Sequence, residues 1–274
     1  MLNLNRDRIN YHNKDTRIKL SIQNHADFLL KILHIQDKVV LVLEKDMTTT
    51  EGKNFKLDFK AELKSRKILD VEGESKIIRD EQLKKSLGYR DEIYCKEKKQ
   101  TITIMISLSK GNNQRTYKSD YCIIFEPYLI EIKNFDGEEY LNKYKNKVEN
   151  NDVFTQDECA EFEMIPEMYF EQNMEDVIIE LAHLLNKANI TKTNKNLLVT
   201  IMNLSIDYYI EDKDKRKELM EMLKMEEAYK SQYDKLIDCA IEEGEDRGIK
   251  KGRKEGIAVN HFFNQFLFHH IFLR

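Results

Sequence analysis

The chain has 274 residues, 41% of them hydrophobic and 34% charged, which is enough apolar material for one sizeable core. No stretch approaches the roughly 20 apolar residues of a membrane span, and the first 19 residues are polar and charged, so we expect neither a membrane segment nor a secretory signal. The four cysteines lie far apart without a CxxC pair, which argues against a disulfide frame or a zinc site and predicts reduced thiols in a cytoplasmic protein.

The net charge of −4 is not that of a typical nucleic-acid-binding protein, but the charge is unevenly distributed. Residues 53–99 hold 14 Lys and Arg against 10 Asp and Glu, a local excess of four positive charges. Such a surface attracts a polyanion, although it is also the ordinary charged surface of a soluble protein.

The first half of the chain is predicted to mix helices and strands. Residues 1–20 are expected to be a loose lead-in. Apolar periodicity predicts helices over 25–35 and 80–96, and strands over 39–43, 55–63, 67–73, 101–108, 121–125 and 129–132. Polar loops are expected at 48–54 and 110–119, and Asp136-Gly137 is expected to form a turn.

Beyond about residue 140 the pattern becomes helical. Thr155 followed by Glu158 fits a capping box, and helices are predicted over 174–185, 196–210 and 215–223. We therefore expect an α/β protein in four parts: a lead-in over 1–20, a mixed sheet flanked by helices over 21–140, a helical extension over 141–228, and a charged helix and tail over 229–274.

The last part of the chain carries two unusual patterns. Glycine recurs every four residues at Gly244, Gly248, Gly252 and Gly256, with charged residues between. Each glycine costs a helix about 1 kcal/mol relative to alanine, so residues 229–258 are either a self-association helix that needs a partner or a mobile charged tail. Residues 261–274 are rich in phenylalanine and are either a docking segment or a frame-shifted end.

The segments around Asp58 and Glu72 are the most informative of the chain. If the two strands turn about Ser65, opposite residues have numbers that sum to 130. Asp58 then faces Glu72, Lys56 faces Glu74, and Lys60 faces Asp70, with Cβ atoms about 5 Å apart. The other face of this hairpin carries mostly apolar residues, namely Leu57, Phe59, Ala61, Leu63, Leu69 and Val71.

A group of carboxylates on one strand face has two interpretations. Mg²⁺ prefers oxygen ligands, usually one or two carboxylates with water and a substrate phosphate, and Asp58 with Glu72 would supply that pair. Opposed like charges are unfavourable without a cation, which favours a metal. The alternative is a solvated strand face with Lys–Glu pairs at its rim, and spacing alone favours this alternative.

The order of these segments resembles a known nuclease core. An apolar strand, a strand with Asp, a strand with Glu-x-(Lys/Gln), a helix and a further strand make up the core of the PD-(D/E)XK nucleases. Residues 25–135 resemble more narrowly the recombination-promoting nuclease and putative transposase (Rpn) family. The matching segments are His25-Ala26-Asp27-Phe28-Leu29-Leu30, Leu57-Asp58-Phe59, Asp70-Val71-Glu72-Gly73-Glu74-Ser75 and Arg90-Asp91-Glu92-Ile93-Tyr94.

The resemblance implies a restriction-endonuclease-like fold and a DNA endonuclease that uses Mg²⁺, or Mn²⁺ in its place. Asp58 and Glu72 fall on the metal-binding positions. Glu74 falls where the family has Gln and the wider superfamily has Lys, and a carboxylate there cannot donate a hydrogen bond to an attacking water. We expect Lys56, opposite Glu74 in the inferred register, to supply the missing cation.

Three further residues are candidates for contacts with DNA or with the metal ligands. Lys60 lies on the carboxylate face. Arg90 and Tyr94 lie one helical turn apart and are placed to steady a phosphate or the Glu72 carboxylate; alternatively, Tyr94 belongs to the core with Arg90 beside it.

The sequence thus leaves two functions open. One is a Mg²⁺-dependent deoxyribonuclease with Asp58, Glu72, Glu74 and Lys56 in its site. The other is a catalytically decayed relative that binds DNA or assembles through residues 229–258. The motifs GxxxxGK[ST], GxGxxG, HExxH and GxSxG are absent from the sequence, which disfavours other common enzyme classes.

Overall fold

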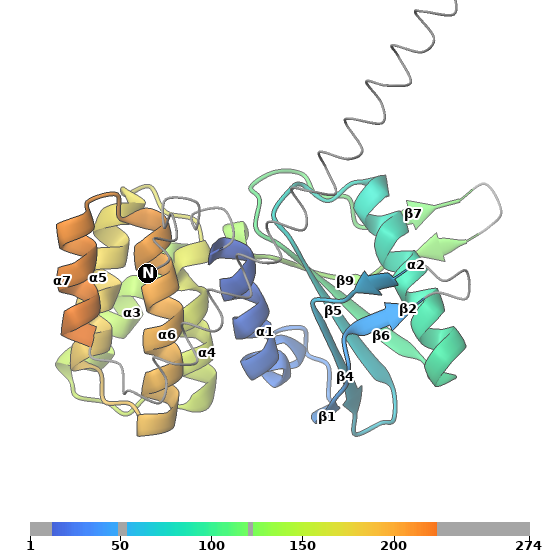
Figure 1. Cartoon of the computed structure of the whole chain (residues 1–274), viewed down its shortest axis with the longest axis horizontal. Coiled ribbons are helices and arrows are strands. Elements are labelled where there is room, and N and C mark those ends of the chain that lie inside the picture. The colour runs from blue at the N-terminus through green and yellow to red at the C-terminus, as the bar shows by residue number, and fades with distance from the viewer. Residues whose placement is uncertain (1–12, 49–53, 120–122, 224–274) are drawn as a thin grey trace, which may run out of the picture.

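The computed structural model describes residues 13–48, 54–119 and 123–223 (Figure 1). Its helices and strands follow one another as α1 (Asn13–Ile32), β1 (Val39–Val42), β2 (Asp46–Thr48), β3 (Asn54–Lys56), β4 (Phe59–Leu63), β5 (Ile68–Glu74), α2 (Asp80–Glu97), β6 (Thr101–Ser107), β7 (Tyr117–Lys118), β8 (Ile124–Phe125), β9 (Tyr128–Glu131), α3 (Gly137–Glu149), α4 (Gln156–Met164), α5 (Met174–Lys187), α6 (Lys192–Tyr209) and α7 (Lys213–Leu223), with short 3₁₀ turns at Ile132–Asn134 and Ile165–Glu167.

The main sheet has five strands in the order β1-β4-β5-β6-β9. β1, β4 and β5 are antiparallel neighbours, whereas β6 and β9 run parallel to β5. Helix α2 connects β5 to β6, which is the crossover that a parallel pair requires. Two small ribbons, β2–β3 and β7–β8, lie outside this sheet. The predicted mixed α/β class is therefore confirmed.

The β4–β5 hairpin has the register inferred from the sequence. Lys60 lies opposite Asp70 and Phe59 opposite Val71, so opposite numbers sum to 130. The turn is closed by the Leu63 N–H, which donates to the Lys67 carbonyl at 2.9 Å, and Arg66 takes a left-handed conformation (φ 68°). The alternating apolar residues fix this register because a slip of one residue would exchange the two faces.

Both faces of the sheet are covered. One face packs against α1, which lies between the sheet and the bundle formed by α3 to α7 (Figure 1). A single continuous core runs from Phe59 and Val71 in the sheet to Leu181 in α5 and Ile206 in α6. Helix α2 covers the opposite face, where Leu57, Ile68 and Ile93 form a smaller core with Met47.

Several boundaries differ from the sequence prediction. Residues 13–20, expected in the lead-in, belong to α1, which is kinked at His25 (φ −131°, ψ 27°). The strand predicted over 55–63 is interrupted at Leu57-Asp58. Its first part, β3, leaves the main sheet and pairs with β2, and Leu57 therefore packs under α2 and not beside Phe59.

The helical half follows the prediction closely. The capping box of α4 is present, with the Glu158 N–H donating to Thr155 Oγ1 and the Thr155 N–H donating to Glu158 Oε2. Asp136-Gly137 is not a free turn: Asp136 accepts the Glu139 N–H and caps α3, which starts at Gly137. None of the helices in the described ranges combines the length and apolar character needed to cross a membrane. The predictions for 229–258 and 261–274 concern residues outside those ranges.

Candidate functional site

Asp58 and Glu72 are held together by backbone hydrogen bonds. Asp58 immediately precedes β4 and Glu72 lies in β5. The Asp58 N–H donates to Glu72 Oε1 at 3.1 Å, and the Gly73 N–H donates to Asp58 Oδ2 at 3.0 Å. The interruption of the strand at residue 58 frees its N–H from the sheet ladder for this contact. The two residues expected to be metal ligands are therefore adjacent.

Asp70 lies on the same face of β5, two residues before Glu72, and is fully buried. In the described part of the chain, neither of its carboxylate oxygens accepts a hydrogen bond of normal geometry. Burial raises the pKa of Asp70 to about 7, against the opposing influence of Thr103 beside it in β6. We name Asp58, Asp70 and Glu72 the acid cluster. Because residues 70 and 72 are two apart in a strand and so share a face, the sequence alone could have added Asp70 to the candidate ligands.

The acid cluster is not a solvated strand face. Glu72 is 3% exposed and Asp70 0% because α2 packs over this side of the sheet. Burial raises the pKa of Glu72 well above its usual value, and the nearby charges of Asp58 and Asp70 raise it further. Burying carboxylates close together without full compensation is unfavourable, so the cluster attracts positive charge. The solvated-face interpretation is wrong for Asp70 and Glu72.

One ammonium group beside this cluster is that of Lys85 in α2. Lys85 Nζ lies 3.6 Å from Glu72 Oε2 and 3.5 Å from Glu74 Oε1, and its side chain is about half exposed. Burial alone would lower the pKa of Lys85, but the charges of Glu72 and Glu74 outweigh it and raise that pKa. The ammonium also lies 5.2 Å from the centre of the Tyr89 ring. Helical spacing from the buried Ile93 was the sequence signal that could have placed Lys85 on this face.

A second ammonium reaches the cluster from α1. Lys19 Nζ lies 3.4 Å from Asp58 Oδ1, and the side chains of both residues are about four-fifths buried. Sequence reasoning missed Lys19 because it lay in the predicted lead-in. The contact depends on α1 crossing the sheet, which no local pattern reveals.

The strand pairing expected for Lys56 is not what the structure has. Lys56 ends β3, which pairs with β2 so that Lys56 lies opposite Asp46, and the residue is exposed. The hairpin register is correct, but the strand does not continue past Asp58. Lys85 from the helix lies beside Glu74, with its Nζ 3.5 Å from Glu74 Oε1.

The remaining candidates have other partners. Lys60 is 5% exposed and donates to Glu97 Oε1 at 3.0 Å, so it is not an exposed DNA contact. Arg90 lies 4.9 Å from the centre of the Phe125 ring and pairs with Asp91, its neighbour in sequence. Tyr94 is 56% exposed and therefore is not a core residue. The face of α2 that meets the acid cluster carries residues 85, 89 and 93 instead.

The acid cluster has the donor set for a hard cation. Mg²⁺ is commonly bound through one or two carboxylates, with water and substrate oxygens completing its octahedron, and Asp58 with Glu72 provides such a pair. Burial raises the pKa values of Asp70 and Glu72 despite the neighbouring ammonium groups, so these carboxylates are only partly compensated. Among the described residues no group of three or more His, Cys, Asp or Glu side chains converges as a ready metal cage.

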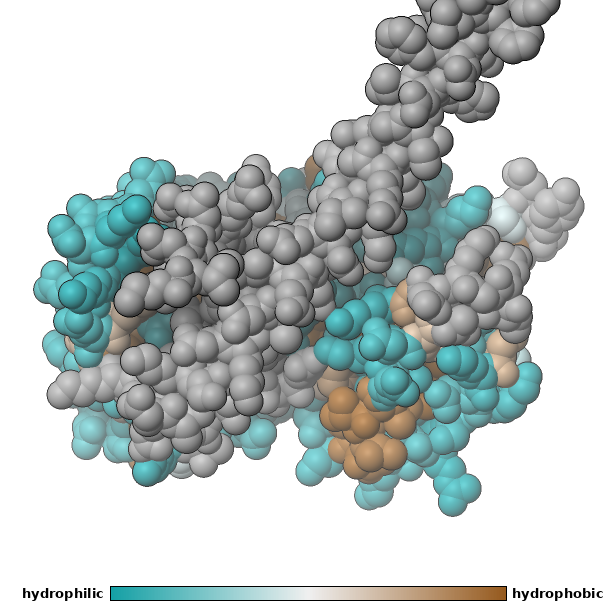
Figure 2. All heavy atoms as spheres, in the orientation of Figure 1, coloured by the Kyte–Doolittle hydropathy of each residue, from teal (hydrophilic) through white to brown (hydrophobic). Residues whose placement is uncertain are grey.

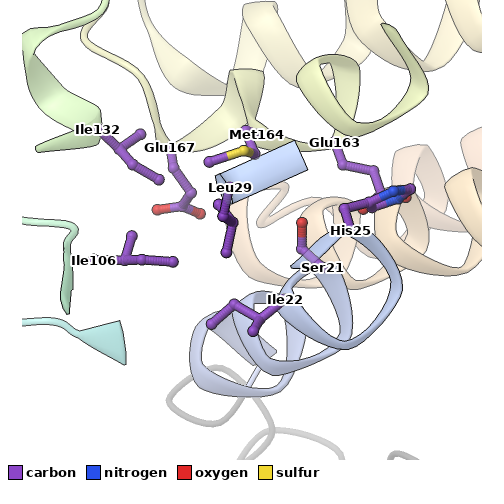
Figure 3. A pocket seen from close by; sticks show the side chains of 9 residues that line it. All are labelled: Ser21, Ile22, His25, Leu29, Ile106, Ile132, Glu163, Met164 and Glu167. Carbon is purple, nitrogen blue, oxygen red and sulfur yellow. The ribbon is translucent and has the colours of Figure 1, made fainter. Parts of the chain in front are cut away.

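A second buried polar group lies where α1 meets α4. His25 Nε2 and Glu163 Oε1 are 2.8 Å apart, and both residues line a small cavity with Ser21, Leu29 and Glu167 (Figure 3). Figure 3 shows the Glu163 side chain against His25, whereas the Glu167 carboxylate points toward the other side of the cavity. Burial raises the pKa of Glu163. The pair lies at the kink of α1 and joins this helix to the bundle.

No protein-family model, curated protein or solved structure matches this chain.

Proposed function

We propose that this protein is a Mg²⁺-dependent DNA endonuclease with a restriction-endonuclease-like sheet, in which Mn²⁺ can replace Mg²⁺. The observation that carries the proposal is the Asp58–Glu72 pair, in which the Asp58 N–H donates to Glu72, the Gly73 N–H donates to Asp58, and the Lys85 ammonium lies beside the buried Glu72. The strand order supports it. A helix, three antiparallel strands, a helix and a strand parallel to the third form the framework in which the resemblance puts Asp on the second strand and Glu on the third.

Asp58 and Glu72 would hold the ion, with Asp70 adding negative charge behind them. When bound, the ion supplies a Lewis acid that polarises a phosphodiester and lowers the pKa of a bound water. The acid cluster needs little rearrangement for this role because the backbone N–H groups of Asp58 and Gly73 already orient two of its oxygens. Hydrolysis forms a bond from a water oxygen to phosphorus and breaks one P–O ester bond.

Lys85 is the residue that compensates for Glu74. A carboxylate cannot donate to the attacking water, but Glu74 Oε1 lies 3.5 Å from Lys85 Nζ and holds a donor in its place. The half-exposed ammonium is available both to the water and to the charge that develops on phosphate oxygens. Glu74 is thus a positioning residue, and Lys85 takes the role that the sequence assigned to Lys56.

The test is nicking of supercoiled plasmid by the full chain with Mg²⁺ or Mn²⁺. We expect Asp58→Asn and Glu72→Gln to lose at least about 100-fold in rate, while Lys56→Ala stays close to the wild type because the strand of Lys56 pairs with β2 and not with β5. A wild-type protein that does not cleave with either ion would overturn the proposal. In that case the alternative of a DNA-binding scaffold predicts affinity that falls steeply with salt and is unchanged by Asp58→Asn.

A further inference from the structure

The two candidate metal ligands each meet a backbone N–H through one oxygen and an ammonium group through the other. Asp58 Oδ2 accepts the Gly73 N–H at 3.0 Å, and Asp58 Oδ1 lies 3.4 Å from Lys19 Nζ. Glu72 Oε1 accepts the Asp58 N–H at 3.1 Å, and Glu72 Oε2 lies 3.6 Å from Lys85 Nζ. A cation that binds through the two oxygens that do not accept these N–H groups therefore meets an ammonium group at each of them.

The two ammonium groups differ in what holds them. Lys85 Nζ also lies 3.5 Å from Glu74 Oε1, so it keeps a carboxylate when an ion takes Glu72 Oε2. Lys19 meets the acid cluster through Asp58 Oδ1. Mg²⁺ binds its oxygen ligands at about 2.0–2.1 Å, so an ion on Asp58 Oδ1 would lie within about 5.5 Å of an ammonium that stayed in place. Two cations repel each other at that separation, so the ion and Lys19 compete for the same oxygen.

The contact between Lys19 and Asp58 is not an ordinary surface ion pair. On the face drawn in Figure 2, the coloured surface of the sheet half is mainly hydrophilic apart from an apolar area at β1. The side chains of Lys19 and Asp58 are only 21% and 18% exposed. Salt screens a largely buried pair less than an exposed one, so this ammonium acts on Asp58 even at physiological ionic strength. It stands on a flexible four-carbon stem and can leave Asp58 without a movement of α1.

We propose that Lys19 is a displaceable counter-ion of the candidate metal site. Its ammonium balances the charge of Asp58 until a divalent cation takes Asp58 Oδ1, and it then leaves that oxygen. Because the ion must displace this contact, Lys19 raises the ion concentration at which the site fills and so restrains the protein when the ion is scarce. The inference rests on the proposed function, since it takes Asp58 as an ion ligand, and it adds the residue that regulates when this ligand is available.

The first experiment is calorimetric titration of the full chain with Mn²⁺. Lys19→Met removes the charge and keeps an unbranched apolar side chain, so we expect this variant to bind the ion at least about tenfold more tightly than the wild type. Lys19→Arg keeps the charge and should bind the ion about as the wild type does. Lys31→Met is the matched control, because Lys31 lies on the same helix but pairs with Asp157, and it should leave the affinity unchanged.

The outcomes of this titration separate the role of Lys19 from the proposed function. If Lys19→Met binds Mn²⁺ no more tightly than the wild type, while Glu72→Gln still weakens binding, the role of Lys19 is overturned and the metal site remains. If neither the wild type nor Lys19→Met binds the ion, both proposals are overturned.

A second measurement uses the wild-type protein and so does not depend on the folding of a variant. Acylation of lysine amines, followed by mass spectrometry, should be several-fold faster at Lys19 with saturating Mn²⁺ than with a chelator, because the amine leaves Asp58. Lys84, which is exposed on α2, is the control and should be labelled at the same rate in both conditions. A labelling rate of Lys19 that is the same with Mn²⁺ and with the chelator contradicts the displacement.

Discussion

Replacing Asp70 by asparagine should stabilise the protein, and the gain should grow with pH. Asp70 is fully buried, and both its oxygens lack a normal hydrogen bond in the described chain. Its folded-state pKa is about 7, raised from 3.8 by burial. Stability from the protonated acid is therefore fully present below about pH 3.8 and is lost as the pH rises through about 7.

The size of the effect follows from these two values. At 1.36 kcal/mol for each unit of pKa, the difference between about 7 and 3.8 corresponds to about 4 kcal/mol. The asparagine amide does not titrate. The unfolding free energy of Asp70→Asn relative to that of the wild type should therefore rise by up to about this amount as the pH goes from acidic values to above 7. A buried amide that lacks a partner costs about 1–3 kcal/mol, but this cost is the same at every pH. The test is therefore how the stability difference between variant and wild type changes with pH, and not its size at one pH.

The assay is urea unfolding in the presence of a chelator, at a series of pH values. The sequence has no tryptophan, so circular dichroism is the suitable signal. Asp91→Asn is the matched control, because Asp91 is 61% exposed and its neutralisation should change stability little at any pH. If the stability difference between Asp70→Asn and the wild type is flat from about pH 4 to about pH 8, the account of Asp70 as a buried acid with a raised pKa is wrong.

Two further substitutions test other parts of the structure. Lys85→Ala should lower the rate of DNA cleavage by about 100-fold, whereas Lys84→Ala, its exposed neighbour on α2, should leave the rate near the wild-type value; equal rates for both would remove Lys85 from the site. Gly137→Ala should lower thermal stability by about 1–3 kcal/mol because a Cβ there would overlap the Phe170 ring, while Gly88→Ala, in open space on α2, should raise it by up to about 1 kcal/mol. If the melting temperatures of Gly137→Ala and Gly88→Ala shifted in the same direction, the difference in packing around the two glycines would be contradicted.

The sequence predicts most of the secondary structure because its patterns are local. Ile102, Ile104 and Ile106 alternate in β6, and Thr155 with Glu158 caps α4, as the structure has them. The register of β4 and β5 could also be deduced, since the alternation of apolar residues puts Phe59 and Val71 on the same face. Local alternation could not reveal that the strand ends at Asp58 because the residues before and after the break have similar character.

The candidate site was predicted only in part. Asp58 and Glu72 belong to the two arms of one hairpin, so the hairpin register alone brings them together. Lys19 and Lys85 reach them from α1 and α2, and this depends on how helices pack on a sheet. Burial of Asp70 likewise depends on α2 covering that face. The ammonium groups of the site therefore depend on tertiary packing, whereas the pairing of Asp58 with Glu72 follows from the local hairpin.

The central claim is that Asp58 and Glu72 bind a divalent cation, and calorimetric titration of the full chain with Mn²⁺ or Mg²⁺ tests it without relying on activity. We predict saturable binding of about one ion per chain at neutral to mildly alkaline pH, weakened at least about tenfold in Glu72→Gln and Asp58→Asn but not in the control Asp91→Asn. Undetectable binding by the wild type, or equal binding by the wild type and Glu72→Gln, would contradict the claim.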